Sequence, residues 1–418
     1  MTPVKVIIAG AGSRGAGYAQ YAKLYPDRMS VVGVAEPRDY YRNQLVKEYK
    51  IPSEHVFTDW KDMAAQPKFA DAVIVATQDA MHEEPAVAFA NLGYAMLLEK
   101  PMAPTVEACE NIIKAVKAND IPFAVGHVLR YTAFSRKLKE LIDSGIIGDV
   151  ISLDRVEPVG FWHMGHSFVR GNWGNTDKSS FMLLAKSCHD IDWIHYMMGA
   201  DCTKVSSFGS LSHFKADQAP VGAAERCLDC PPEVEKECPY SAIRLYLQGC
   251  LGRGHTGWPV DVITSDLTEE GVTKALREGP YGRCVYHCDN DVVDHQTVNM
   301  GFSGGQTATF SMMAFTPGGE HRSTRVFGTR GQLIGDGEKI EIYDFNTDSR
   351  KIIQANQSDG SILGGHGGGD YGLMHAFIEA LITGDRSHIL SGPDETLLSH
   401  QIVFAAEQSR LEDQVVFL

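Results

Sequence analysis

A glycine-rich segment near the N-terminus has the residue types and spacing of a phosphate-binding turn. Gly10, Gly12 and Gly15 follow the apolar run 4–9. Gly10 permits a tight turn out of a strand, Gly12 lets the backbone approach a pyrophosphate, and Gly15 lets the next helix pack on the sheet. The N-terminus of that helix would face the phosphates. The pattern predicts a dinucleotide site, and the alternative is an ordinary turn between a strand and a helix.

Glu36 is the acidic residue that such a site requires about 20 residues after the last glycine. It directly follows the second apolar run, 31–35. A carboxylate there accepts hydrogen bonds from the ribose 2'-hydroxyl of NAD and repels the 2'-phosphate of NADP. Arg38 leaves NADP as an alternative cofactor, because a guanidinium group can bind a phosphate through two parallel hydrogen bonds. We predict NAD as the cofactor.

Polar residues at the carboxyl ends of later apolar runs could take part in a second function, proton transfer. In an open parallel sheet the ligand lies beyond these ends. Lys100 could hydrogen-bond both a nicotinamide ribose and a substrate hydroxyl, and partial desolvation would lower its pKa toward the range useful for proton transfer. The alternative is a surface lysine before a turn proline. The predicted cofactor-binding residues are Gly10, Gly12, Ser13, Arg14, Gly15, Glu36, Arg38, Thr77, Gln78, His82, Glu99 and Lys100.

The elements that must position these residues are strands and helices in alternation. Further continuous apolar runs lie at 72–76, 94–98 and 122–125. Continuous runs are typical of parallel strands buried on both faces. Helical patterns cover 85–92 and 106–118, and Thr105 is a predicted N-cap of the second. We expect a doubly wound parallel sheet that forms an NAD-binding domain over residues 1–125.

The hydrophobic period changes in the second half of the chain. Apolar residues alternate with polar ones in 298–302 and 308–312, on either side of a turn at 303–306. Alternation of this kind indicates antiparallel strands with one buried face. Further strands are predicted at 324–327, 331–334, 340–343 and 351–353.

Two predicted helices, 181–198 and 394–411, carry apolar stripes that could cover such a sheet. We therefore expect residues 126–418 to form an α+β domain with a large, mostly antiparallel open sheet for substrate binding and oligomerisation. A cysteine-rich insertion is expected at about 212–295.

The first of these helices carries a polar stripe on an otherwise apolar surface. Lys186 and His189 are three residues apart and project from one face, which Asp192 continues by another turn. This stripe predicts a cavity. A histidine there can take a hydroxyl proton as hydride leaves the same carbon. A buried histidine is also commonly structural.

A segment rich in aromatic, histidine and arginine side chains spans 161–173. Ring faces stack on the C–H surfaces of a carbohydrate, while Arg and His bind hydroxyls or a carboxylate. The same composition suits a subunit interface. The predicted substrate-binding residues are His127, Arg130, Tyr131, Trp162, His163, Arg170, Trp173 and Asp192.

The cysteines of the insertion form a separate candidate site. Cys227 and Cys230 make a C-x-x-C pair, Cys238 follows, and Cys284 and Cys288 come later. We predict a closed, structural zinc site with Cys288 as the fourth ligand. A packed apolar cluster and a labile iron–sulfur centre are the alternatives.

Composition excludes several classes of partner. The net charge of −15 argues against nucleic acid, and no apolar run reaches the length of a membrane span. The sequence begins with a strand pattern and without a basic, apolar leader, which predicts a cytoplasmic protein with reduced thiols. We expect a homo-oligomer, a dimer or a tetramer.

The order of the motifs resembles the glucose-fructose oxidoreductase, inositol dehydrogenase and rhizopine catabolism (Gfo/Idh/MocA) family. Glu99-Lys100-Pro101 is the most specific of them. The resemblance implies an NAD-dependent oxidoreductase with Lys100 and His189 as catalytic residues. The family's inositol dehydrogenases have an aspartate where this chain has Ala185, so either Lys186 takes over its role in orientation and charge stabilisation or the chemistry differs from simple alcohol oxidation. The matching segments are 10–15, 76–82, 99–101, 144–148, 189–192 and 325–331.

Three functions are compatible with these residues. The leading hypothesis is an oxidoreductase acting on a hydroxyl of a sugar, cyclitol or glycoside, with Lys186 and Arg170 orienting the ligand. The alternative is a glycosidase or lyase in which bound NAD oxidises the ring transiently, elimination follows, and the hydride returns. A silent sensor of NAD and sugar is the third, and the presence of both Lys100 and His189 argues against it.

Overall fold

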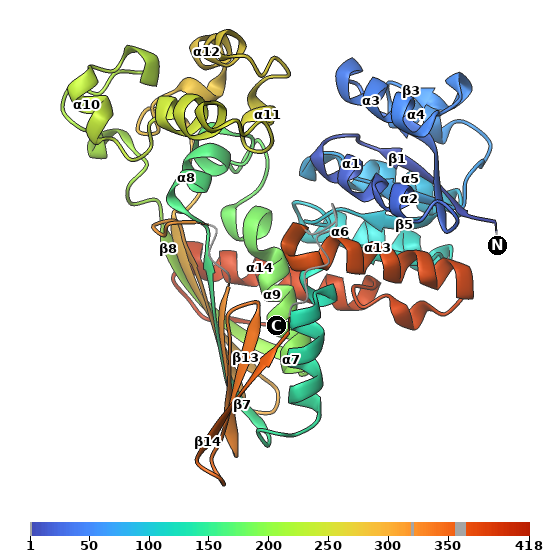
Figure 1. Cartoon of the computed structure of the whole chain (residues 1–418). Coiled ribbons are helices and arrows are strands. Elements are labelled where there is room, and N and C mark those ends of the chain that lie inside the picture. Colours follow the sequence, from blue (N-terminus) through green and yellow to red (C-terminus); the bar gives the residue numbers. More distant parts are fainter. Residues whose placement is uncertain (1, 319–321, 356–364) are drawn as a thin grey trace.

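The N-terminal part of the chain forms a six-stranded parallel sheet with strand order β3-β2-β1-β4-β5-β6 (Figure 1). The structure is a computed structural model that describes residues 2–318, 322–355 and 365–418. The expected continuous runs form β4, β5 and β6, which are buried along their whole length. This confirms the doubly wound sheet. Its strands are β1 Val4–Ala9, β2 Met29–Ala35, β3 Val56–Phe57, β4 Ala72–Val75, β5 Ala95–Leu98 and β6 Phe123–Val125.

Helices cover both faces of this sheet. The predicted helix 106–118 is found with the same bounds, and the hydroxyl of Thr105 accepts a hydrogen bond from the Ala108 amide at 3.2 Å, as expected of an N-cap. Much later in the chain, α13 (Gly365–Thr383) packs on the same core through Leu373 and Phe377. The helices between the strands are α1 Ser13–Ala19, α2 Tyr21–Leu24, α3 Asp39–Tyr49, α4 Trp60–Ala64, α5 Glu83–Asn91 and α6 Val106–Ala118.

The second sheet has nine strands in the order β14-β13-β12-β11-β7-β10-β9-β8-β15. Its neighbours are antiparallel except for β7 and β10, which run parallel. The large, mostly antiparallel sheet is therefore confirmed. Its strands are β7 Val150–Pro158, β8 Cys202–Ser210, β9 His295–Phe302, β10 Thr307–Met313, β11 Ser323–Gly328, β12 Gly331–Gly335, β13 Lys339–Asp344, β14 Ser349–Gln354 and β15 Val416–Phe417.

Strand β7 lies at the centre of this sheet and was not predicted. Its buried face carries Leu153, Arg155 and Glu157. Because two of these three side chains are charged, the strand lacks the apolar alternation that marks a half-buried strand. Sequence patterns overlook a strand whose inner face is polar.

Two long helices connect the sheets. α9 (Met182–Met198) packs on β7 and β10, and α14 (Pro393–Glu412) packs on α9, on β8 and on α6 of the first layer (Figure 1). This arrangement brings the start of α9 toward the carboxyl ends of β4 and β5. Among the described residues, no helix combines the length and the apolar character needed to cross a bilayer.

Residues 211–294 separate β8 and β9, which pair directly with each other. They have a small core of their own that includes Ala242, Tyr246 and Val272. In Figure 1 the helices of residues 211–294 lie beside one end of the large sheet, at the opposite end from β14. The remaining helices of the second half are α7 Ala133–Asp143, α8 Phe161–His163, α10 Pro232–Glu237, α11 Val260–Ile263 and α12 Glu269–Glu278.

Candidate functional site

The glycine-rich turn between β1 and α1 requires glycine for two different reasons. Gly10 has φ +95°, and a Cβ on it would lie 2.4 Å from the carbonyl oxygen of Ala76. A Cβ on Gly15 would lie 1.9 Å from the oxygen of Gly10, which is far inside van der Waals contact. At Gly12 the nearest atom to such a Cβ is the Nη2 of Arg38, at 3.3 Å. The turn is therefore tightly packed inward and has a backbone edge that a pyrophosphate can approach.

Glu36 is buried at the end of β2 and holds a defined hydrogen-bond set. Its carboxylate accepts from the Ala11 amide at 2.8 Å and from Arg38 Nε at 2.7 Å. Burial alone would raise the pKa of Glu36, but the hydrogen bonds from Arg38 and Ala11 outweigh it and lower the pKa. The Arg38 guanidinium also lies over the ring of Tyr41, at 4.3 Å. Arg38 therefore covers the carboxylate that a ribose would need.

A second group of charges surrounds Glu99 at the end of β5. Arg14 Nε donates to Glu99 at 2.5 Å, and Arg14 Nη2 donates to Asp370 at 2.6 Å, which links α1, β5 and α13. The Lys100 amide donates to the other Glu99 oxygen at 2.6 Å. Burial raises the pKa of Glu99, yet the charges of Arg14 and Lys100 lower it overall. Glu99 is thus a fixed anion that orients the residues around it.

His82 connects the ends of β4 and β5. Its ring nitrogens lie 2.8 Å from the carbonyl oxygen of Pro101 and 3.2 Å from that of Thr77. The ring is buried, whereas Gln78 and Ser13 are exposed. These contacts indicate that His82 holds the ends of β4 and β5 together. Gln78 and Ser13, which are also predicted cofactor-binding residues, are exposed and can be reached by a ligand.

Lys100 extends from the first sheet to the second half of the chain. Its Nζ donates to the carbonyl oxygen of Ala185 at 2.7 Å. The next residue, Lys186, has its Nζ 2.9 Å from Glu157 of β7. The structure therefore brings both predicted catalytic lysines to the start of α9. Ala185, which stands where the resemblance places an aspartate, contributes its backbone oxygen.

His189 lies one turn further along α9, in contact with Arg322. The Arg322 Nη2 is 2.8 Å from His189 Nε2, and its Nε is 2.6 Å from Asp190 and 2.7 Å from Glu157. A guanidinium group can only donate, so His189 Nε2 accepts in this arrangement. Proton acceptance from a substrate at that nitrogen would require the hydroxyl to replace Arg322.

His163 lies near the charged residues of α9 and β7, because the charges of Lys186 and Lys100 contribute to its pKa. Burial lowers its pKa well below the ordinary range, and the charges of Lys186 and Lys100 lower it further. Its imidazole ring lies beside that of Trp258, with centroids 5.0 Å apart. The aromatic segment 161–173 thus reaches the charged residues of α9 and β7 with a neutral imidazole.

Four other predicted substrate-binding residues form a buried brace. Arg130 donates to both carboxylate oxygens of Asp192 at 2.7 Å, and His127 Nε2 is 3.8 Å from the same carboxylate. The hydroxyl of Tyr131 is 2.9 Å from the hydroxyl of Ser391. All four predicted residues are at most 2% exposed. Their contacts join three parts of the chain and do not present them at an open surface.

The aromatic segment and the insertion together line a pocket of about 390 Å³. Trp162 and Trp258 lie beside each other there, with ring centroids 5.2 Å apart and ring planes inclined at 57°. Trp173 instead donates to Asp79, which follows β4, at 3.2 Å. Arg170 borders the pocket but is buried, with its donors directed to backbone oxygens of Arg283 and Tyr240, each at 2.7 Å. Its expected role in orienting a ligand has no support from these contacts.

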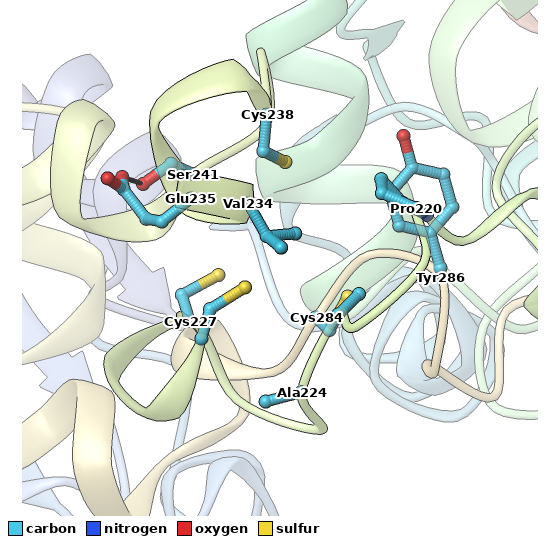
Figure 2. Close-up of a pocket in the computed structure, with 11 residues that line it drawn as sticks. Pro220, Ala224, Cys227, Val234, Glu235, Cys238, Ser241, Cys284 and Tyr286 are labelled. Carbon is cyan, nitrogen blue, oxygen red and sulfur yellow. Dashed lines mark hydrogen bonds between the residues drawn. The ribbon is translucent and has the colours of Figure 1, made fainter. Parts of the chain in front are cut away.

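Figure 2 shows the second, smaller pocket, in which Cys227, Cys238 and Cys284 are arranged around Val234. Cys230 also lines it. Cys288 is not among the lining residues, and its thiol donates to the carbonyl oxygen of Cys284 at 3.2 Å. Cys284 therefore joins Cys227, Cys230 and Cys238 at this pocket. Across the part of the chain that the structure describes, no three side chains of the ligating types form a group that could hold a metal ion.

Sequence reasoning missed several charged residues of the site or ranked them low. Arg155 and Glu157 are two positions apart in β7 and therefore share a face, a signal that recognition of the strand would have revealed. Arg322 directly precedes β11 and lies outside the motifs described above. Asp190 is adjacent to His189 and receives Arg155 Nε at 2.9 Å. The partners of these residues are far apart in the chain, so no local spacing predicts them.

The chain matches two models of one family. An NAD-binding Rossmann-fold model of the Gfo/Idh/MocA oxidoreductases matches residues 4–127, and the C-terminal domain model of the same family matches residues 135–334. The chain belongs to the Gfo/Idh/MocA family of oxidoreductases, as its motifs indicated.

Several curated proteins resemble the chain over part of its length. The "putative oxidoreductase YteT" of Bacillus subtilis is 26% identical over 72% of this chain and 70% of that protein. An "inositol 2-dehydrogenase" of Pseudomonas savastanoi is 26% identical over 57% of this chain and 69% of the relative. A "2,7-anhydro-N-acetylneuraminate hydratase" of Escherichia coli is 25% identical over 49% of this chain and only 53% of the relative, so the match spans about half of that enzyme.

Solved structures share the fold along the whole chain. A levoglucosan dehydrogenase in complex with NADH and L-sorbose has a TM-score of 0.72 and 17% sequence identity, covering 100% of this chain and 99% of that one. At this identity the match establishes a common fold.

Proposed function

We propose that this protein is an NAD-dependent oxidoreductase that acts on a hydroxyl group of a sugar, cyclitol or glycoside. The observation that carries the proposal is the meeting of Lys100, from the end of a Rossmann strand, with Lys186 and His189 on α9. A proton acceptor is thereby placed beyond the carboxyl end of the strand, where a nicotinamide ring lies in this fold. The dehydrogenases among the relatives support the substrate class.

The residues fit the cofactor. Gly10, Gly12 and Gly15 form the turn for the pyrophosphate, and Glu36 is placed for the adenosine ribose once Arg38 moves aside. Bound NAD+ supplies a hydride acceptor. Lys100, as a neutral amine that still donates one N–H to the oxygen of Ala185, would receive the substrate hydroxyl proton and become an ammonium group as the C–H bond breaks.

The alternative function is elimination with NAD as a recycled oxidant. The absence of an aspartate at Ala185 and the similarity to a hydratase over part of the chain favour keeping it. A screen of sugars, uronates, cyclitols and aryl glycosides, read at 340 nm and by product analysis, separates the two. Net NADH formation supports the dehydrogenase. Cleavage or hydration without net NADH supports the cycling enzyme, and no reaction with any compound contradicts both.

We expect the protein to bind NADH at least tenfold more tightly than NADPH, a difference of about 1.4 kcal/mol. The reason is that the Glu36 carboxylate remains ionised, since its pKa is lowered, and would repel a 2'-phosphate. Glu36→Ala should narrow the ratio, measured by fluorescence titration. Equal affinities in the wild type would assign the site to Arg38 and to NADP.

The second proposal is that the cysteine pocket binds a structural zinc ion. It is supported by Arg170, which is buried without a carboxylate partner among the described residues and lies 3.4 Å from Cys227 Sγ. The Ala242 amide approaches the same sulfur at 3.5 Å. A buried cation is costly unless negative charge lies beside it, and zinc with four thiolates supplies that charge. The thiols would have to converge on the ion by side-chain rotation.

Elemental analysis of protein kept reduced tests the zinc proposal, with about one zinc per chain expected. Cys284→Ser should lose most of the metal, whereas the matched control Cys288→Ser should retain it. Chelation should lower the melting temperature before it affects NADH binding. Metal-free wild-type protein that melts at the same temperature with and without added zinc would leave the cysteines a packing role.

Assembly and location stay predictions. We propose a cytoplasmic homo-oligomer that has neither nucleic acid nor a membrane as a partner. The exposed apolar side chains of Ile151 and Phe208, on two strands of the large sheet, support a subunit contact on this sheet.

A further inference from the structure

The described charged residues between α9 and the large sheet, in 2–318, 322–355 and 365–418, contain more cations than carboxylates. Lys186 and Arg322 share Glu157, at 2.9 and 2.7 Å, and Arg322 and Arg155 share Asp190, at 2.6 and 2.9 Å. Among the side chains that the structure describes, three cations are thus balanced by two carboxylates. The group, which we call the cationic cluster, is largely removed from water, so its excess charge is weakly screened.

Lys100 lies next to the cationic cluster and adds a positive charge to it whenever it is protonated, as it is after it has taken up the substrate proton. Its Nζ is bound by the neutral carbonyl of Ala185, and among the described residues no carboxylate oxygen lies within 4.0 Å of it. An oxidised nicotinamide ring placed beyond β5 would add one more positive charge.

The titration of neighbouring groups is consistent with a positive potential. Burial lowers the pKa of Arg155 to about 10, and the charge of Arg322 adds to this effect although Asp190 opposes it. Burial would raise the pKa of Glu157, yet Arg322 and Lys186 bring it well below its usual value. His163 is kept neutral in the same way, by burial and then by Lys186.

Two members of the cluster remain accessible to a ligand. The side chains of Lys186 and Arg322 are 16% and 19% exposed, whereas that of Arg155 is 3% exposed. An ammonium group and a guanidinium group side by side are a typical carboxylate-binding pair, and the guanidinium can bind both oxygens.

We propose that the substrate is an anionic sugar, with a carboxylate bound by Lys186 and Arg322 while Lys100 faces the hydroxyl that is oxidised. This inference rests on the proposed function and deepens it. A neutral polyol would leave the excess charge of the cationic cluster uncompensated, whereas a uronate or another sugar acid neutralises it. The competing explanation is that the excess charge only stabilises a developing alkoxide, in which case neutral sugars are bound equally well.

The test compares hexuronates with the aldoses of the same configuration, namely glucuronate with glucose, galacturonate with galactose and mannuronate with mannose. Calorimetric titration of the NADH-bound protein measures affinity without turnover. At least one uronate should bind about tenfold or more tightly than its aldose. The inference is overturned if no uronate of the panel binds more tightly than its aldose.

Two variants test whether Lys186 and Arg322 cause the preference for uronates over aldoses. Lys186→Met and Arg322→Gln should each bring the uronate-to-aldose ratio of the tightest pair close to one, while NADH affinity and the circular dichroism spectrum stay unchanged. Lys178→Met is the matched control, since Lys178 pairs with Asp289 at the surface, and it should keep the ratio. A ratio that survives both cluster variants would also overturn the assignment.

The outcome is separable from that of the proposed function. NADH formation at 340 nm with neutral sugars and no uronate preference would refute the anionic substrate and keep the oxidoreductase. A uronate preference without hydride transfer or transformation of any compound would keep the binding site and refute the proposed reaction.

Discussion

Lys100→Met is expected to lower kcat by about 10²-fold or more, the usual scale for a positioned acid–base group. The substitution keeps the length of the side chain and removes the ammonium group that contacts Ala185 across the two halves of the chain. The Glu99 carboxylate, held by Arg14, is still in place to orient the backbone, so NADH affinity should change little. Steady-state rates at 340 nm with the best substrate of the screen give kcat, and fluorescence titration gives the NADH affinity.

His189→Ala should produce a loss of similar size if His189 also handles the proton, and Lys186→Ala should follow it if Lys186 replaces the family's aspartate. Lys114→Met, an exposed lysine on α6, is the control and should stay within about twofold. An unchanged kcat in Lys100→Met would transfer the proton-transfer role to His189 or His163.

Asp192→Ala is expected to lower the free energy of unfolding by about 3–5 kcal/mol, because it leaves the buried guanidinium of Arg130 without a counter-charge. The pair has both contacts at 2.7 Å, and neither side chain is more than 2% exposed. Urea unfolding followed by circular dichroism measures the change. The control is Asp289→Ala, which removes a half-exposed carboxylate whose partners Lys178 and Arg283 both remain in contact with water, so its loss should cost at most about 1 kcal/mol.

The Arg130–Asp192 ion pair also leads to a prediction for the stability of the protein at acidic pH. Burial raises the pKa of Asp192, but Arg130 outweighs burial and the net pKa is lowered. A carboxyl with a lowered folded-state pKa stabilises the protein above its ordinary pKa and loses this contribution as the pH falls through the lowered value. Asp192→Ala should therefore show a weaker loss of stability in acid than the wild type. A destabilisation below 1 kcal/mol, or an unchanged acid profile, would contradict a buried ion pair.

Local sequence determined the first half of the fold. The strands at 72–75, 95–98 and 123–125 are continuous apolar runs, and Thr105 caps α6 as expected. These signals are short-range, since a turn, a cap or a buried strand depends on residues within one element. For the same reason the positions of Gly10, Glu36 and Lys100 at the ends of strands could be inferred.

The sequence also located the strands β9 to β14, but not β7, β8 or β15. The inner face of β7 carries Arg155 and Glu157, whose charges are neutralised by residues from other elements. A buried charge is stable only with its partner, and the partner is not visible in the pattern of the strand itself.

Only the tertiary structure decided how the polar residues divide among different roles. Asp192 continues the stripe of Lys186 and His189, yet its carboxylate is bound by Arg130, which is 62 positions away. Arg170 belongs to the aromatic segment but faces the cysteine pocket, where Cys284 rather than Cys288 is found. Arg322 reaches His189 and Asp190 from more than 130 positions away. Spacing along the chain fixes which face of an element a side chain occupies, whereas its charge partner depends on which elements fold against that face.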